Sequence, residues 1–367
     1  MVPTISRIST AFCAANRHRP SPSPRLIRYN NPAMSHHTFT LPKLNSRNLP
    51  WPVHWPDLFG ADRPLILEIG FGQGHMLLHL AQQHPDSNIV GLEISNRCLV
   101  RAEERIVKRS LHNVRVIHAP AETALNHLFA PDSLSEVHIN FPDPWFKSRH
   151  EHRRLMQRST VDVIINRLKP GARLYLATDI IEYAEMSAEL LAETPQLDNV
   201  LDTPWTSAVP GRTPTKYEQK ARREGRDCYF FIYQRNDQPG PAIPVIKEMV
   251  MPHVVLESPL SFEAIQDAFE PIEHNEPDLH INVQYVYQGK RALLFETHVK
   301  EPTIDQRVAL NLLTRDTPGE LTLQLSMLGH PRPTAGVHAA ANLIADWLLS
   351  LHPDTRIIKR KTRSTED

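Results

Sequence analysis

Short apolar runs alternate with longer amphipathic stretches from Leu65 onwards. Apolar runs of this kind predict buried strands, whereas apolar residues spaced three and four apart predict helices. Strands are predicted at residues 65–69, 88–92, 114–118, 136–141, 172–178 and 229–234, and helices at 75–84, 97–109, 121–129, 152–168 and 181–193. The alternation predicts an α/β fold, in which a Rossmann-like, mainly parallel sheet carries helices on both faces and binds its ligand at the carboxyl ends of the strands.

A segment rich in proline and glycine, residues 238–244, divides this pattern from a second one. The second pattern is a smaller α+β arrangement. Its strands are predicted at 250–256, 281–287, 291–299, 320–328 and 355–359, and its helices at 261–268 and 334–351. A chain of 367 residues accommodates two domains. We predict one domain over residues 46–237, a linker at 238–244, and a small domain of undefined role over 245–367.

The N-terminal residues 1–45 show neither periodicity. They contain no Asp or Glu and are rich in proline, serine and arginine, so we predict a disordered basic extension. Residues 1–33 are similar in composition to an organelle transit peptide. Because Met34 opens a more ordinary sequence, a mis-assigned start upstream of the mature chain is the alternative.

Charge is uneven along the chain although the net charge is zero. Residues 1–56 hold seven Lys or Arg and no acid, 147–158 hold five against one, and 212–226 hold six against two. Residues 245–367 hold seventeen acids against twelve bases. A polyanion such as a nucleic acid is therefore expected to bind the part of the chain before residue 245.

Cysteine, histidine and hydropathy patterns exclude several classes of protein. The three cysteines form no CxxC pair, which argues against a disulfide framework or a zinc site and favours a cytoplasmic location. His150-Glu151-His152 is the nearest approach to a ligand cluster, and we interpret it as surface polarity, so no metal is expected. No apolar run approaches the ~18 residues of a membrane span. The oligomeric state is not predicted.

A glycine-rich turn follows the first predicted strand. Gly70, Gly72 and Gly74 let a ligand approach the backbone closely, because no Cβ intrudes. Glu68 precedes them, and Glu93 ends the next strand, where a carboxylate can bind ribose hydroxyls. Acids suit the cationic sulfonium and ammonium of S-adenosyl-L-methionine and would repel a dinucleotide pyrophosphate. We predict an S-adenosyl-L-methionine site from these five residues; the alternatives are an NAD site, which the GxGxG spacing disfavours, and a packing turn with two surface acids.

The loop after the fourth strand, Asn140-Phe141-Pro142-Asp143-Pro144-Trp145-Phe146-Lys147, carries the candidate chemistry. Two prolines stiffen it around Asp143, whose acceptor-only carboxylate can bind the donors of a methyl acceptor and offset a positive charge that methylation creates. The alternative is a rigid turn with a capping Asp. Lys147, Arg153 and Arg154 are placed to bind phosphates, or to form only a solvated basic surface.

Two further segments reach the same predicted sheet edge. Asp179 follows the fifth strand and is either a further site acid or the cap of the next helix. Thr215, Lys216, Tyr217 and Glu218 precede a basic helical turn. Thr215 and Glu218 stand in capping-box register, which explains both without any function.

Taken together, these segments resemble the tRNA (guanine-N7-)-methyltransferase family over about residues 50–235, and the Phe-Pro-Asp-Pro-Trp-x-Lys-x-Arg-His run from Phe141 is the most specific. The resemblance implies a class I methyltransferase fold, with Glu68, Glu93 and Asp143 in the cofactor pocket and Asp143 also catalytic. It further implies that Lys147, Asp179 and Thr215 to Glu218 contact tRNA. The usual target is guanine 46 in the variable loop, which has to be flipped out of its stack.

The chain departs from the family at two places. Pro120 stands where family members commonly carry an Asp or Asn that reaches adenine, so we expect only backbone groups to bind the adenine there. Residues 245–367 lie beyond the family's ordinary end. The alternatives are a methyltransferase acting on another RNA or a small molecule, and a cofactor-binding module whose task belongs to residues 245–367.

Overall fold

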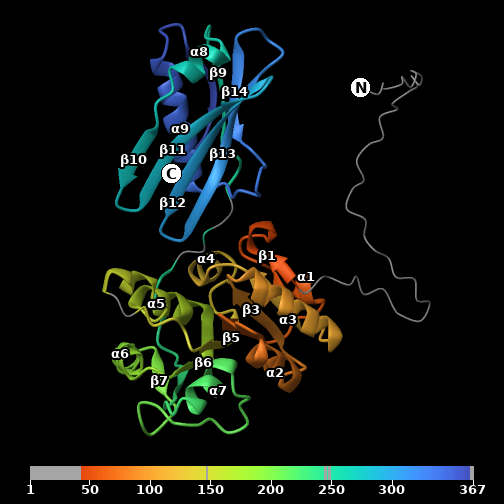
Figure 1. Ribbon diagram of the computed structural model, residues 1–367, viewed down its shortest axis with the longest axis vertical. Coiled ribbons are helices and arrows are strands. Elements are labelled where there is room, and N and C mark those ends of the chain that lie inside the picture. The colour runs from red at the N-terminus through yellow and green to blue at the C-terminus, as the bar shows by residue number, and fades with distance from the viewer. Residues whose placement is uncertain (1–42, 146–147, 244–245, 247–248, 364–367) are drawn as a thin grey trace, which may run out of the picture. The chain divides into compact units, whose positions relative to one another are not determined.

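The computed structural model describes residues 43–145, 148–243, 246 and 249–363 (Figure 1). The expectations for residues 1–42, including the transit peptide, lie outside the described residues. Residues 43–45 contradict the predicted disorder of residues 1–45. They form strand β1 (Lys43–Asn45), which pairs in parallel with strand β4 (Val114–His118) and thereby satisfies its backbone groups.

The first sheet has the strand order β1-β4-β3-β2-β5-β6-β8-β7. The other strands are β2 (Leu65–Ile69), β3 (Asn88–Glu93), β5 (Leu134–Asn140), β6 (Leu168–Thr178), β7 (Leu197–Asn199) and β8 (Tyr229–Arg235). The pairs from β1 to β6 are parallel, and β8 is antiparallel to both β6 and β7. The predicted mainly parallel sheet is confirmed.

Helices cover both faces of this sheet, as predicted (Figure 1). They are α1 (Trp55–Phe59), α2 (His75–Gln83), α3 (Asn96–Lys108), α4 (Ala121–His127), α5 (Arg158–Arg167), α6 (Ile181–Ala192) and α7 (Lys216–Arg223), with short 3-10 turns η1 (Ser46–Asn48) and η2 (Ser148–Arg153). Ile66 of β2 packs with Leu77 and Ile106 from α2 and α3. Leu67, the next residue of β2, packs with Leu125 from α4 on the other face.

One predicted helix is wrong in its extent. Residues 152–168 were expected to be helical, but the chain leaves η2 at Arg153, begins α5 only at Arg158, and enters β6 at Leu168. Met156 explains the interruption, because its side chain is buried and its N–H donates to the hydroxyl of Tyr183 at 3.2 Å. The backbone between the two helices is thus satisfied by a tertiary contact that has no local signal.

The residues after the proline-rich segment form a separate antiparallel sheet with the order β10-β11-β12-β13-β14-β9-β15. Its strands are β9 (His253–Glu257), β10 (Ile272–Glu276), β11 (Leu279–Gln288), β12 (Ala292–Glu301), β13 (Ile304–Thr314), β14 (Glu320–Leu325) and β15 (Arg356–Lys361). Helices α8 (Phe262–Asp267) and α9 (Ala335–Ser350) pack against it. The predicted α+β class is confirmed, although β10 and β13 were missed.

Two further properties concern the chain as a whole. Among the described residues no helix combines the length and apolar character needed to cross a membrane. Strand β8 ends at Arg235 and strand β9 begins at His253, so the predicted linker lies between two sheets. The domain boundaries themselves stay predictions.

Candidate cofactor and substrate site

The glycine loop between β2 and α2 adopts a conformation that demands its glycines. Gly70, Gly72 and Gly74 have φ angles of 70°, 52° and 75°, in the left-handed region where a Cβ is strained. The turn closes through a hydrogen bond from the Gly74 N–H to the Phe71 carbonyl at 2.8 Å. A Cβ built on Gly70 would meet nothing within 4 Å, so this part of the loop is open to a ligand.

Glu93 fastens the same loop to the end of β3. Its carboxylate accepts the N–H groups of Gly72 at 2.9 Å, Ile94 at 2.8 Å and Ser95 at 3.0 Å. These bonds fix the acid beside the glycine turn, one strand away from Glu68. Glu93, the acid predicted to bind ribose, therefore lies beside the glycine loop.

Glu68 provides the test of whether a cationic cofactor fits. It is buried, and its Oε1 accepts a hydrogen bond from Asn140 Nδ2 at 3.0 Å. Its Oε2 has no hydrogen-bond partner among the residues that the structure describes. Burial raises the pKa of this carboxyl from 4.5 to about 7. A buried carboxylate oxygen without a partner is costly, and an ammonium or sulfonium group beside it would remove that cost.

A small hollow lies beside Glu68 and the glycine loop. The residues lining it are Glu68, Gly70, Phe71, Gln73, His75, Met76, Asn140, Thr215, Lys216 and Tyr217. A Cβ on Gly72 would lie 3.7 Å from the Tyr217 ring, so this half-exposed ring borders the loop. The residues present fit S-adenosyl-L-methionine, with acids for its cationic groups and open backbone for close approach. Lys216 and Tyr217 thus border the cofactor hollow, a position that the sequence did not assign to them.

The loop after β5 is held in a strained conformation. Phe141 and Trp145 have φ angles of 53° and 42°, which cost non-glycine residues on the order of 1–3 kcal/mol each. The Phe141 N–H donates to the Ala177 carbonyl of β6 at 2.7 Å. Arg154 donates to the carbonyls of Pro144 at 3.1 Å and Trp145 at 3.4 Å. Arg154 therefore stabilises this conformation of the loop through two of its backbone carbonyls.

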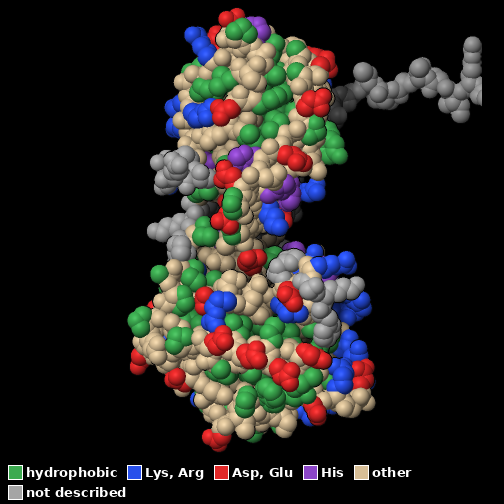
Figure 2. Space-filling model, turned by 90° about the vertical axis from the view of Figure 1, so that its left-hand side faces the viewer, with side chains coloured by type: hydrophobic (Ala, Val, Ile, Leu, Met, Phe, Trp, Pro, Cys, Tyr) green, Lys and Arg blue, Asp and Glu red, His purple; other side chains and the backbone are tan. Residues whose placement is uncertain are grey.

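Three more of the predicted site residues, Asp143, Lys147 and Arg153, belong to this loop or follow it closely. Asp143 is exposed between the two prolines and does not line the hollow beside Glu68. Arg153 is exposed, with its guanidinium over the Trp145 ring at 5.1 Å. Lys147 lies outside the described residues. Figure 2 shows a group of Lys and Arg side chains along one edge of the lobe that carries this loop.

A hydrogen-bond network joins this loop to the segment before α7. Asn140 Oδ1 accepts from Arg212 Nη2 at 2.7 Å, and Arg212 Nη1 pairs with Glu218. Arg212 also lies over the Phe230 ring, at 4.8 Å from its centroid. Arg222 Nε and Nη2 donate to Glu218 Oε1 at 3.1 and 3.0 Å. Arg212 connects the network, and no role was predicted for it, because only the folded chain brings it to Asn140.

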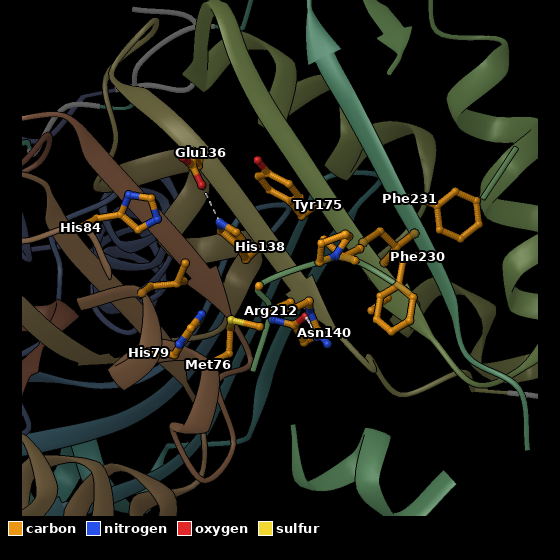
Figure 3. Close-up of a pocket in the computed structure, with 16 residues that line it drawn as sticks. Met76, His79, His84, Glu136, His138, Asn140, Tyr175, Arg212, Phe230 and Phe231 are labelled. Atoms are coloured by element: carbon orange, nitrogen blue, oxygen red, sulfur yellow. Dashed lines mark hydrogen bonds and ion pairs between the residues drawn. The ribbon is translucent and has the colours of Figure 1, made fainter. Parts of the chain in front are cut away.

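A second hollow, of about 170 Å³, adjoins this network and shares Met76 and Asn140 with the first (Figure 3). His138 points into it, donates from Nε2 to the Glu136 carboxylate at 2.8 Å and stacks on Tyr175 with centroids 4.4 Å apart. Burial lowers the pKa of His138, although Glu136 opposes that shift. A neutral imidazole in a buried, paired position is consistent with packing, and we assign this hollow no chemistry.

Thr215 and Glu218 take the positions that the capping register predicted. Thr215 is the N-cap of α7, and its hydroxyl accepts the Glu218 N–H at 3.1 Å. Glu218 is buried between Arg212 and Arg222, so its carboxylate orients those side chains. Both residues build the segment that presents Lys216 and Tyr217.

Asp179 and Pro120 complete the predicted set. Asp179 pairs with Arg226, whereas the Ile180 N–H at the start of α6 donates to Thr178 Oγ1 at 3.3 Å. The N-cap of α6 is Ile180 and accepts no side-chain cap hydrogen bond, so Asp179 does not cap this helix. Pro120 is the exposed N-cap residue of α4, next to Ala119, whose N–H donates to the Glu93 carbonyl at 3.3 Å. Within the described ranges no three His, Cys, Asp or Glu side chains are grouped to hold a metal ion.

The sheet, the glycine loop with its two acids and the loop after β5 define the chain as a class I S-adenosyl-L-methionine-dependent methyltransferase. A family described as putative methyltransferase matches residues 62–231. A tRNA (guanine-N(7)-)-methyltransferase of Thermus thermophilus is 34% identical over 303 residues, which cover 81% of this chain and 93% of that protein. One of Paraburkholderia xenovorans is 38% identical over 181 residues, covering 49% of this chain and 69% of that protein. The chain belongs to the tRNA (guanine-N(7)-)-methyltransferase family.

The family model ends at residue 231, close to the expected end near residue 235, whereas the Thermus thermophilus relative matches more of the chain. An alignment of 303 residues is longer than the predicted domain 46–237 and extends beyond it.

Among solved structures, an rRNA methylase of Streptococcus thermophilus has 13% identity and a TM-score of 0.35, covering 49% of this chain and 93% of that one. A putative methyltransferase of Streptococcus mutans, in complex with S-adenosylhomocysteine, has 12% identity and a TM-score of 0.32, covering 48% and 93%. The family assignment rests on the sequence relatives alone.

Proposed function

We propose that this protein transfers a methyl group from S-adenosyl-L-methionine to N7 of guanine 46 in the variable loop of tRNA, and that it does so in the cytoplasm. The observation that carries the proposal is the hydrogen bond between Asn140 and Glu68. It links the last residue of β5, from which the loop with Asp143 begins, to the acid beside the cofactor hollow. The cofactor hollow and the loop assigned to the guanine are thereby adjacent. Methyl transfer requires the donor and the acceptor to be held close together.

The acids of the glycine loop are assigned to the cofactor. The unpartnered Oε2 of Glu68 suits a cationic group of the donor, and Glu93 suits its ribose hydroxyls. Gly70, Gly72 and Gly74 leave room for close approach, and Pro120 lies near the end of β4, where it offers only backbone contact for the adenine. When bound, S-adenosyl-L-methionine supplies the electrophilic methyl group.

Asp143 is assigned to the reacting base. Guanine N7 attacks with a lone pair and has no proton to lose, so a strong base is not needed. An exposed carboxylate between two prolines can accept the N1 and N2 donors of guanine and offset the positive charge that N7 methylation creates. Its place at the tip of the strained loop favours contact with a base that has been flipped out.

The cations around the loop are assigned to the tRNA backbone. Arg153 is exposed over Trp145, and Lys216 lines the hollow. Lys147 is assigned from its place in the sequence, two residues after Trp145. Arg154 contributes by holding the loop, and Tyr217 offers its exposed ring. Asp179 and Glu218 act through their partners Arg226 and Arg212.

The experiment compares tRNA transcripts that differ at one nucleotide. The full chain is incubated with donor labelled in its methyl group and with tRNA that carries guanine or adenine at position 46. Label is expected in the first transcript and not in the second. Equal labelling of both would overturn the assignment to position 46, and labelling of neither would overturn tRNA as the substrate.

A further inference from the structure

Helix α3 carries a row of arginines along one face. Arg97, Arg101, Arg105 and Arg109, the last at the C-cap, follow one another at intervals of four residues. Residues four apart lie above one another on a helix, so these side chains share a face. The opposite face packs into the core through Leu99, Ala102 and Ile106. We call the four arginines the α3 stripe.

No arginine of the α3 stripe makes an ion pair with a residue that the structure describes. Within the residues that the structure describes, no ion pair or hydrogen bond involves the side chain of Arg97, Arg101 or Arg109, and Lys108 beside them is likewise unpaired. Two basic residues of α7 differ, since Lys220 pairs with Glu224 and Arg222 with Glu218. Like charges at four-residue spacing repel one another and destabilise a helix. An anion bound along this row would reduce that repulsion.

The α3 stripe lies against the cofactor loop. Arg105 Nη1 donates to the Gln73 carbonyl at 2.5 Å, and a Cβ on Gly74 would lie 3.5 Å from the Ala102 side chain of α3. Burial lowers the pKa of His75, the first residue of α2. Three cations lower that pKa further: Arg105, Arg109 and Lys216. Positive charge from two separate elements therefore converges beside the hollow.

The sheet order places this charge opposite the loop after β5. Helix α3 follows β3, which lies on one side of β2, whereas the loop with Arg153 follows β5 on the other side. A ligand bound at the carboxyl end of β2 is thus flanked by basic residues on both sides. Two flanking basic surfaces suit an extended polyanion better than a small anion.

We propose that the α3 stripe, together with Lys216, is a second phosphate-binding surface for the tRNA backbone, on the cofactor side of the reacting guanine. This inference rests on the proposed function, because it takes tRNA as the polyanion. The arginines contact phosphates only, so they add affinity and orientation without reading sequence.

The test compares two variants that lose the same charge. The stripe variant is R97Q/R101Q/R109Q, which spares Arg105 because that residue holds the Gln73 carbonyl. The control is R63Q/K169Q/K290Q, three exposed cations, of which Arg63 and Lys169 lie near the amino ends of β2 and β6 and Lys290 lies between β11 and β12. tRNA affinity is measured across a series of salt concentrations, and S-adenosylhomocysteine affinity and thermal unfolding are measured in parallel.

The stripe variant is expected to bind tRNA about tenfold more weakly at low salt, with a salt slope shallower by about 2, while the control keeps both values. Binding of S-adenosylhomocysteine and the unfolding midpoint should be unchanged in both. If the stripe variant unfolds at a lower temperature, R97Q/R109Q replaces it, because both side chains are exposed.

The outcomes separate this inference from the proposed function. A wild-type protein that binds and methylates tRNA, with a stripe variant that matches the control, overturns only the role of α3. A wild-type protein that neither binds nor methylates tRNA overturns the proposed function and this inference with it.

Discussion

Asn140 donates a hydrogen bond from Nδ2 to Glu68 Oε1 at 3.0 Å, although the two residues are 72 positions apart in the sequence. The bond joins the end of β5 to the end of β2, which are neighbouring parallel strands. The same amide accepts from Arg212 through Oδ1 at 2.7 Å. One side chain thus connects the cofactor acid, the loop with Asp143 and the segment before α7.

Glu68→Gln is expected to weaken binding of S-adenosylhomocysteine by about tenfold to a hundredfold, since a charged hydrogen bond to a ligand is worth about 1.5–3 kcal/mol. Calorimetric titration measures the affinity. Glu104→Gln, at an exposed acid of α3, is the control and should bind as the wild type does. Unchanged affinity in Glu68→Gln would remove Glu68 from the cofactor site.

The raised pKa of Glu68 makes the stability of the cofactor-free protein depend on pH. The folded carboxyl binds its proton up to about pH 7, whereas the unfolded one releases it near 4.5. Wild-type stability should therefore fall as pH rises between these values, by on the order of 2–3 kcal/mol. Glu68→Gln lacks this loss, so its free energy of unfolding relative to wild type should be larger at pH 8 than at pH 5. Parallel pH profiles for the two proteins in urea unfolding would contradict the buried carboxyl.

Asp143→Asn is expected to lower the single-turnover rate of tRNA methylation by about 10²–10³, because one preorganised charged group contributes that much. The thermal unfolding midpoint should not change, since Asp143 is exposed. Asp202→Asn, at another exposed aspartate, is the control. A near wild-type rate in Asp143→Asn would show that this residue is only structural.

Arg153 and Arg154 are neighbours with different expected roles. Arg153→Gln should weaken tRNA binding and reduce its salt slope by about 1, because an exposed phosphate contact is lost. Arg154→Gln should leave the salt slope unchanged and lower kcat, because the strained loop loses two hydrogen bonds to Pro144 and Trp145. The two variants are compared by tRNA titrations over a salt series and by steady-state kinetics. Identical effects on slope and kcat would refute the division of roles.

The fold could be predicted from the sequence where its signals are local. The glycine loop, the strands from Leu65 to Thr178 and the capping register of Thr215 each depend on residues that are close in the chain. The exceptions are elements whose partners are distant. β10 is a polar edge strand, and the break before α5 depends on Tyr183.

The sequence indicated which types of residue form the candidate site, but it did not indicate which of them contact one another. Asp179 and Arg226 are far apart in sequence, so their pairing followed only from the folded chain. The role of Arg212 had no signal because Asn140, which it joins to the nearby Glu218, lies 72 residues away on β5. Periodicity marks which side chains are buried, but it does not say which two polar groups meet.

The most direct test of the central claim is the position of the transferred methyl group. tRNA is incubated with the full chain and labelled S-adenosyl-L-methionine, digested to nucleosides and analysed by mass spectrometry. The label is expected in 7-methylguanosine, and its amount should fall by about 10²–10³ with Asp143→Asn at equal reaction time within the linear range. Label in any other nucleoside, or no label in 7-methylguanosine with the wild-type protein, would contradict the account.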